Sequence, residues 1–112
     1  MFTITTNDGK NIVGSNQIIE QCKTIKNLLE NFPNETEIDV PYNQHTLLYV
    51  FMFCSISTSS YTEQLDQLST LELADVIKAA DYLEYNELYN LTAKFIGNKF
   101  LYGAYSNSKI SF

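Results

Sequence analysis

The first residues of the chain alternate between apolar and polar side chains. Phe2 and Ile4 are separated by threonine, and Ile12 follows the turn sequence Asn-Asp-Gly-Lys at residues 7–10. Alternation around an Asp-Gly pair is a strong hairpin signal, because Asp and Gly tolerate the positive φ that tight turns need. The pattern predicts that the chain opens with a β-hairpin.

A short helical pattern comes after the hairpin. Ser15 or Asn16 can act as its N-cap, since a side-chain oxygen there can accept a hydrogen bond from an otherwise unpaired N–H of the first turn. The apolar positions of this pattern share one side of a helix. They are Ile18, Ile19 and Cys22.

A second helix is predicted immediately afterwards. Thr24 has the side chain of an N-cap, and Pro33 ends the helix. Between them, four apolar residues follow the i, i+3, i+4, i+7 spacing of one helical stripe. The stripe consists of Ile25, Leu28, Leu29 and Phe32.

A strand and a buried helix are predicted next. Residues 37–40 alternate as a short strand that Pro41 ends. Asn43 can cap the following helix, whose apolar face is too broad for a surface helix, so we expect it to be largely buried. This face contains Leu47, Leu48, Phe51, Met52 and Cys54.

The rest of the chain is mainly helical. Residues 55–60 are predicted to form a loop, and residues 61–68 either a short extended piece or a single turn. Ser69 and Glu72 match a capping box, in which each side chain bonds the other's backbone N–H. The helix that this box opens is expected to break near residues 84–86. Its apolar positions are Leu73, Val76, Ile77 and Ala80.

A last helix is predicted after this break, followed by a tail. We expect the helix to turn four apolar side chains inward. Residues 103–112 have no periodicity, so we expect one domain over residues 1–102 and a fraying C-terminal tail over 103–112. The order of the elements is that of an α+β fold. The inward positions are Leu88, Leu91, Phe95 and Ile96.

Composition excludes several classes of function. The seven basic residues are scattered lysines without any arginine, so we expect no nucleic-acid partner. The formal net charge is −6, and such an acidic surface suits a basic protein partner. The longest apolar run, residues 47–54, is shorter than the ~20 residues of a membrane span. The start of the chain lacks the basic and apolar regions of a signal peptide. We therefore expect a cytoplasmic and/or nuclear protein without a membrane partner.

The sequence offers little for catalysis. His45, the only histidine, stands among polar residues and is expected to lack partners for base or metal chemistry. Cys22 and Cys54 lie in apolar surroundings and are interpreted as buried free thiols, although their pairing stays open. No spacing typical of metal ligands and no glycine-rich phosphate loop is present. We predict a protein that is not an enzyme and binds no cofactor or metal.

Aromatic residues are concentrated late in the chain. Tyrosine is frequent at the centre of protein interfaces, but many aromatics also lie at the margins of a core. We expect most of these residues to be partly buried and the others to contact a partner. They are Tyr82, Tyr85, Tyr89, Phe100, Tyr102 and Tyr105.

Three segments carry a family likeness, and the first and third consist of two stretches each. Phe-Thr-Ile-Thr-Thr-Asn-Asp-Gly at residues 2–9 precedes Thr-Ile-Lys-Asn-Leu-Leu-Glu at 24–30, and Ile-Asp-Val-Pro-Tyr-Asn follows at 38–43. Leu-Ala-Asp-Val-Ile-Lys-Ala-Ala-Asp-Tyr-Leu-Glu at 73–84 precedes Leu-Tyr-Asn-Leu-Thr-Ala-Lys at 88–94. In this order the segments resemble the S-phase kinase-associated (Skp) adaptor family and elongin C, over about residues 2–101.

The resemblance implies a BTB/POZ fold, in which a small three-stranded sheet packs against a helical cluster. It also implies a non-enzymatic adaptor that links an F-box or BC-box substrate receptor to the cullin N-terminal domain of a cullin-RING ubiquitin ligase. The cullin face would comprise Pro41, Tyr42, Asn43, Asp81 and Tyr82. The receptor side would comprise Leu88, Leu91 and Phe95.

The chain departs from the family in three ways. Asp81 replaces the usual asparagine and adds a negative charge where cullin would dock. The acidic loop common in the Skp family is missing between Cys54 and Tyr61. The chain ends soon after Phe100, so we expect no counterpart of the two helices that grip an F-box. Two alternatives stay open: a stand-alone BTB/POZ module that homo-oligomerises or acts as a scaffold, and a decoy of the ligase.

Overall fold

The predicted hairpin forms two strands of the sheet in the computed structural model, which describes residues 2–102 and side chains as far as residue 99. Strands β1 (Thr3–Thr5) and β2 (Asn11–Val13) pair antiparallel. Gly9, in the turn between them, has the positive φ of 77° that favours glycine. The fraying predicted for residues 103–112 lies outside the described residues.

A third strand completes the sheet. Strand β3 (Glu37–Asp39) pairs parallel with β1, so the order is β2-β1-β3 and β1 lies in the middle. Ile4, Ile12 and Ile38 are in register across the three strands, and all three side chains are buried. This row of isoleucines is the apolar face of the sheet, which the period-2 alternation predicts.

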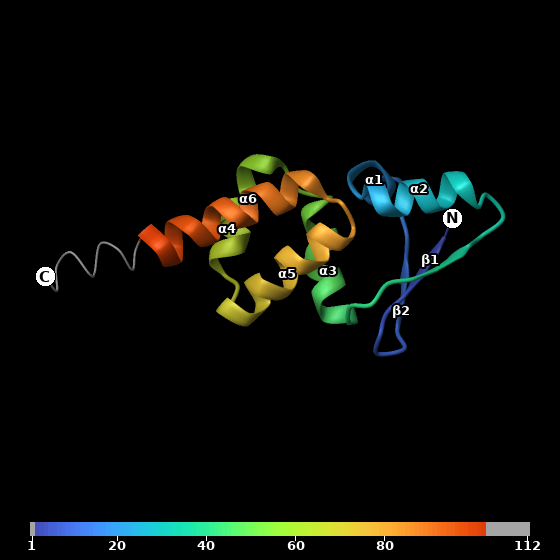
Figure 1. The fold of residues 1–112 in the computed structure, drawn as a ribbon, viewed down its shortest axis with the longest axis horizontal. Coiled ribbons are helices and arrows are strands. Elements are labelled where there is room, and N and C mark those ends of the chain that lie inside the picture. The colour runs from blue at the N-terminus through green and yellow to red at the C-terminus, as the bar shows by residue number, and fades with distance from the viewer. Residues whose placement is uncertain (1, 103–112) are drawn as a thin grey trace, which may run out of the picture.

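Helices α1 (Asn16–Gln21) and α2 (Lys23–Asn31) lie beside the sheet (Figure 1). Ser15, one of the two predicted N-caps, caps α1 by accepting a hydrogen bond from the N–H of Ile18 at 3.4 Å. The prediction that Thr24 caps α2 is wrong. Cys22, with extended backbone, is the N-cap, because only this one residue separates the two helices and α2 therefore begins at Lys23.

The apolar stripe of α2 is only partly buried. Ile25 is completely buried and Leu29 half-buried, but Leu28 is 38% exposed and Phe32 is 58% exposed. The stripe is therefore open to solvent at these two residues. The helix ends at Asn31, so Phe32 is outside it, and Leu28 is at the edge of the stripe rather than at its centre.

Helix α3 (Gln44–Phe53) is the buried helix that the sequence predicts, with one exception. The Oδ1 atom of Asn43 caps it by accepting a hydrogen bond from the N–H of Thr46 at 2.8 Å. Leu47 and Phe51 are buried, but Leu48 is 51% exposed, which corrects the prediction for that residue. Helix α5 packs against one side of α3, and Leu48 lies on a side that stays open to solvent.

The remaining elements form the helical cluster. Residues 61–66 are not an extended piece or a single turn, because they form helix α4 (Tyr61–Asp66), which buries Tyr61 and Leu65 at i and i+4. Leu68, just after the helix, is also buried. A 3-10 turn (Thr58–Ser60) precedes α4. Helices α5 (Thr70–Tyr82) and α6 (Asn86–Ile96) follow, and a π-helical turn (Gly97–Tyr102) continues α6.

Two predicted signals set the limits of α5. Ser69 and Glu72 form the complete capping box, with hydrogen bonds of 3.0 and 3.2 Å between each side chain and the other residue's backbone N–H. At the other end, Glu84 has a positive φ of 55° and separates α5 from α6, which confirms the predicted break. The α+β organisation is thus confirmed, with the sheet at one end of the described chain and α3–α6 forming the cluster (Figure 1).

Candidate protein-binding surface

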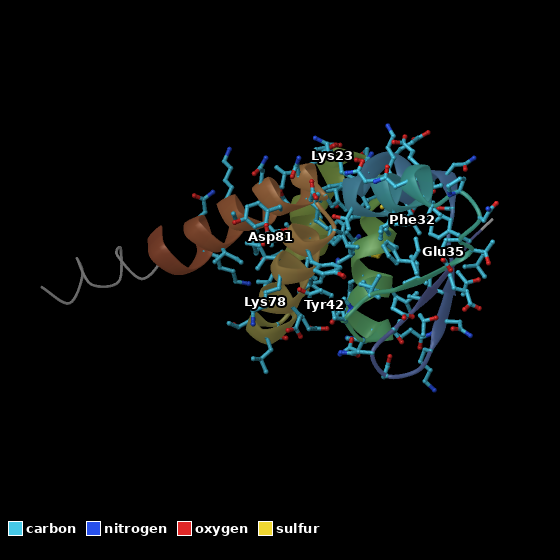
Figure 2. The ribbon with its side chains drawn as sticks, turned by 45° about the vertical axis from the view of Figure 1, so that its right-hand side comes forward. Lys23, Phe32, Glu35, Tyr42, Lys78 and Asp81 are labelled. Atoms are coloured by element: carbon cyan, nitrogen blue, oxygen red, sulfur yellow. The ribbon has the colours of Figure 1, made fainter. Side chains whose placement is uncertain are left out.

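Two tyrosines that are distant in sequence meet on the surface. Tyr42 comes from the loop between β3 and α3, and Tyr82 is the last residue of α5. Their ring centroids are 5.7 Å apart and the ring planes are inclined by 67°, an edge-to-face arrangement. The Tyr42 hydroxyl also donates a hydrogen bond to the backbone carbonyl of Lys78 at 3.1 Å. Figure 2 labels Tyr42, Lys78 and Asp81 in this region.

The loop that presents Tyr42 is held from both sides. The N–H of Val40 bonds the carbonyl of Thr5 at 3.0 Å, and this bond fixes the end of β3 against β1. The N–H of Asn7 bonds the carbonyl of Tyr42 at 3.0 Å, which connects the loop to the hairpin turn. Asn43 then begins α3 through its capping bond. Tyr42 is therefore held in place by hydrogen bonds of the backbone on both sides of it.

Tyr82 is positioned by α2. The hydroxyl of Thr24 donates to the carbonyl oxygen of Tyr82 at 2.9 Å, and the N–H of Thr24 donates to the carbonyl of Leu83 at 3.1 Å. Sequence reasoning missed this contact because Thr24 was assigned to a capping role. No local pattern could have revealed a bond between residues so far apart along the chain. The side chain of Tyr82 remains 43% exposed.

The surface around the two rings is acidic. Partial burial raises the pKa of the Tyr42 hydroxyl, and the nearby Asp81 carboxylate and, more weakly, Asp75 raise it further. Asp75, Lys78 and Asp81 are all exposed on α5. The surface therefore combines accessible aromatic rings with more negative than positive charge, which suits a basic and partly apolar protein partner.

A shallow hollow lies on the sheet side of Tyr82. Its volume is about 410 Å³, and it is formed by the ends of β1 and β3, the hairpin turn and the Tyr82 ring. Of the five residues predicted for this surface, the structure thus brings Pro41, Tyr42, Asp81 and Tyr82 together, while the side chain of Asn43 is engaged as a helix cap. The lining residues are Thr5, Thr6, Asn7, Asp39, Val40, Pro41 and Tyr82.

The residues of the predicted receptor side lie along α6 and differ in accessibility. Leu88 is fully buried in the core. Leu91 and Phe95 are half-buried and pack against the core from its margin. Only Leu91 and Phe95 therefore have surface that a partner could touch, and Leu88 supports them from inside.

The aromatic residues late in the chain also differ in how far they are buried. Tyr85 is completely buried and belongs to the core, whereas Tyr82 and Tyr89 are 43% and 38% exposed. The expectation of partner contact thus applies to Tyr82 and Tyr89. The predictions for Phe100, Tyr102 and Tyr105 concern side chains outside the described part.

His45 has a partner that the sequence did not indicate. Its Nε2 atom lies 3.1 Å from a carboxylate oxygen of Glu72. The pair lies at the surface, with 68% of the histidine side chain exposed. Within residues 2–102, no group of three or more His, Cys, Asp or Glu side chains is placed to hold a metal ion. No helix in the same range is long and apolar enough to cross a membrane.

Comparison with known proteins adds two findings. Residues 1–55, which contain the sheet and α1–α3, match the sequence model of the "Skp1 family, tetramerisation domain". The chain is also 26% identical, over an alignment of 119 residues, to "E3 ubiquitin ligase complex SCF subunit sconC" of Emericella nidulans. That alignment covers 88% of this chain and 74% of the relative.

Proposed function

Because this chain is a member of the Skp1 family with a BTB/POZ fold, we propose that it is a non-enzymatic adaptor of a cullin-RING (SCF-like) ubiquitin ligase. In this role one surface binds the N-terminal domain of a cullin. A second surface binds a substrate receptor of the F-box or BC-box class. The protein would then act by bringing two partners together, and its own side chains would perform no bond-making step.

The observation that carries the proposal is the contact between Tyr42 and Tyr82 beside Asp81. These residues occupy the positions at which the family resemblance implies cullin contact, and they come from two separate segments of the chain. The fold brings them onto one accessible surface with a hollow beside it. Exposed tyrosines in such a position are typical anchors of a protein interface.

Replacement of Tyr82 by lysine tests this surface. The change places a charge where the tyrosine ring would be buried against cullin, so we expect a loss of affinity of at least about a hundredfold. Isothermal titration of the purified chain with a cullin N-terminal domain measures the affinity. Tyr89→Lys is the matched control, because Tyr89 is similarly exposed but lies on α6. Equal affinities for the two variants would assign cullin binding to another surface.

Asp81 sets the charge preference of the same surface. Asp81→Asn removes a carboxylate that is exposed beside Tyr42. If the cullin presents a basic face, this variant binds more weakly at low salt and the difference disappears as salt screens the charge. Tighter binding of the Asn variant would instead show that Asp81 weakens a cullin contact in which the family has asparagine.

A second function is favoured by the exposed apolar residues of α2. Leu28 and Phe32 are accessible, and the matching family model carries the word tetramerisation in its description. In this alternative the chain is a stand-alone BTB/POZ module that oligomerises. Light scattering on the chain alone separates the two functions. A stable homo-oligomer that Phe32→Ser dissociates, together with no cullin complex, would replace the adaptor proposal.

A further inference from the structure

The hollow beside Tyr82 is bounded by the sheet and by an aromatic side chain. Thr5 and Asp39 are in register in the parallel pair of β1 and β3. Residues in register on neighbouring strands point to the same face of a sheet, so the Thr5 hydroxyl and the Asp39 carboxylate lie close together. Both residues line the hollow of about 410 Å³, together with Tyr82. A carboxylate, a hydroxyl and an aromatic ring therefore border one space.

The Asp39 carboxylate is accessible and unpaired. Asp39 is exposed, and its side chain has no hydrogen bond or ion pair with any side chain among residues 2–99. Glu37 lies on the same face of β3 and is also exposed, but it does not line the hollow. An unpaired carboxylate at the wall of a hollow, in a chain of net charge −6, favours a positively charged group from a partner.

Most hydrogen-bond donors around the hollow are already used within the protein. The backbone N–H groups of Thr6, Asn7 and Val40 each donate to a backbone carbonyl at 2.9 to 3.0 Å. The Thr6 hydroxyl donates to the carboxylate of Asp8, and the side-chain amide of Asn7 donates to the carbonyl of Pro41 at 3.5 Å. An anion would therefore find few free donors here, whereas a cation with N–H groups finds free acceptors.

Tyr82 gives the hollow an aromatic wall that is held in place. Its ring meets the ring of Tyr42 edge to face, with 5.7 Å between the centroids, and Tyr82 remains 43% exposed. The face of a tyrosine ring is negative and attracts cations, most often the guanidinium group of arginine. An apolar side chain of a partner could contact the ring, but it would leave the Asp39 carboxylate unpaired.

We propose that this hollow binds an arginine side chain of a protein partner, whose guanidinium stacks on the Tyr82 ring and donates hydrogen bonds to the Asp39 carboxylate. A guanidinium is flat and has several N–H donors, so it can interact with the ring and the carboxylate at once. The ammonium of lysine is a compact point charge without a flat surface. The choice of arginine rests on the hollow, and only the choice of cullin as the partner rests on the proposed function.

A short peptide tests the hollow without a partner protein. Acetyl-Gly-Arg-Gly-amide is titrated into the isotope-labelled chain, and the backbone amide signals are followed by NMR. We expect the signals of Thr5, Asp39 and Tyr82 to shift and saturate, with a Kd of about 1–10 mM for this single side chain. The same peptide with citrulline, which has a similar shape but no charge, should bind at least about fivefold more weakly, and so should the peptide with lysine.

Three outcomes of the titration would overturn the proposal. The first is the absence of saturating shifts at these three residues. The second is equal binding of the arginine and citrulline peptides, which would show that the charge is not recognised. The third is a set of shifts spread over the whole acidic surface, which would show that the peptide is attracted by net charge alone.

Variants assign the roles of the carboxylate and the ring. Asp39→Asn should weaken binding of the arginine peptide about fivefold, whereas the matched variant Glu37→Gln, outside the hollow, should leave it unchanged. Tyr82→Leu should weaken it by a similar factor, and Tyr82→Phe, which keeps an aromatic ring, should weaken it less. The melting curve of each variant is recorded first. Equal binding of the Asp39→Asn and Glu37→Gln variants would contradict the pairing with Asp39.

Titration with a cullin N-terminal domain separates this inference from the adaptor function. Asp39→Asn should weaken that complex about fivefold at low salt, Glu37→Gln should not, and the difference should shrink as salt screens the charges. If Tyr82→Lys abolishes the complex but Asp39→Asn leaves it intact, the adaptor function stands and an arginine of cullin in the hollow is refuted. Binding of the arginine peptide without any cullin complex would support the arginine site and refute the adaptor function.

Discussion

At the scale of single residues, two buried threonines have opposite surroundings. The Thr6 hydroxyl donates to the Asp8 carboxylate and accepts the N–H of Lys10 at 2.9 Å. Thr92 is completely buried in α6, and its hydroxyl has no hydrogen-bond partner within the described part of the chain. A buried hydroxyl without a partner costs stability, whereas one with partners contributes to it.

The same substitution should therefore act in opposite directions at the two sites. Thr92→Val keeps the shape of the side chain and removes only the unpaired hydroxyl, so the free energy of unfolding should stay unchanged or rise by up to about 1 kcal/mol. Thr6→Val should lower it by about 1–3 kcal/mol, because Asp8 and Lys10 lose their partner. Urea unfolding measures both values. A loss of stability in Thr92→Val equal to that in Thr6→Val would mean that both hydroxyls are paired.

Individual side chains also show what periodicity can and cannot predict. The spacing of Leu28 and Leu48 correctly marks them as part of apolar helical faces, yet both are more than a third exposed. Periodicity identifies the apolar side of a helix, but burial also needs a neighbouring element on that side. Which neighbour a helix has is decided by contacts distant in sequence, which no local pattern contains. Tyr42 and Tyr82 were placed together only through the family resemblance.

At the scale of elements, the capping box of α5 couples helix formation to pH. The Glu72 carboxylate accepts the N–H of Ser69 and contacts His45, and these interactions lower its pKa from 4.5 to about 2. Since the folded-state pKa is below the unfolded value, the carboxylate stabilises the fold above pH 4.5. This contribution is lost as the pH falls from about 4.5 toward 2.

Glu72→Gln isolates this contribution. Glutamine can still accept the Ser69 bond but carries no charge, so we expect the variant to be less stable than the wild type at pH 7 and the difference to vanish near pH 2. Thermal melts between pH 2 and pH 7 measure it. His45→Ala should keep most of the pH dependence, because the Ser69 bond is the larger cause. A difference that persists unchanged at pH 2 would contradict the pKa assignment.

Elements with a strong local signal were predictable and the others were not. The Asp-Gly hairpin and the Ser69–Glu72 box are encoded in a few adjacent residues, and both are confirmed. Helix α4 was predicted only as a short extended piece or a single turn, because the spacing of Leu65 and Leu68 does not distinguish these two from a longer helix. The start of α2 was misplaced by two residues, because its N-cap, Cys22, makes no side-chain capping bond and so leaves no local signal in the sequence.

At the scale of the whole molecule, the excess of acids controls solubility. The net charge of −6 at pH 7 vanishes near the isoelectric point of about 4.5. We expect solubility to pass through a minimum there, since molecules without net charge no longer repel each other. Turbidity as a function of pH measures this. The double variant Glu20→Lys, Glu30→Lys should move the minimum to higher pH, because both sites are exposed.

The assembled fold was predictable in outline only. Alternating and helical patterns together indicated an α+β domain, and the three family segments indicated the BTB/POZ arrangement, which the match over residues 1–55 supports. The bond from Thr24 to Tyr82 was not predictable. It depends on how α2 meets the helical cluster, and that arrangement follows from the sum of all core contacts rather than from any motif.

The central position of β1 has a consequence for protein synthesis. The first strand leaves the ribosome with β2 soon behind it, but its other neighbour, β3, emerges only after both intervening helices have been made. A two-stranded hairpin alone is barely stable in water. Strand β1 is therefore made before β3 but stabilised late, and a nascent chain should resist proteolysis at β1 only once residues 37–39 are outside the tunnel.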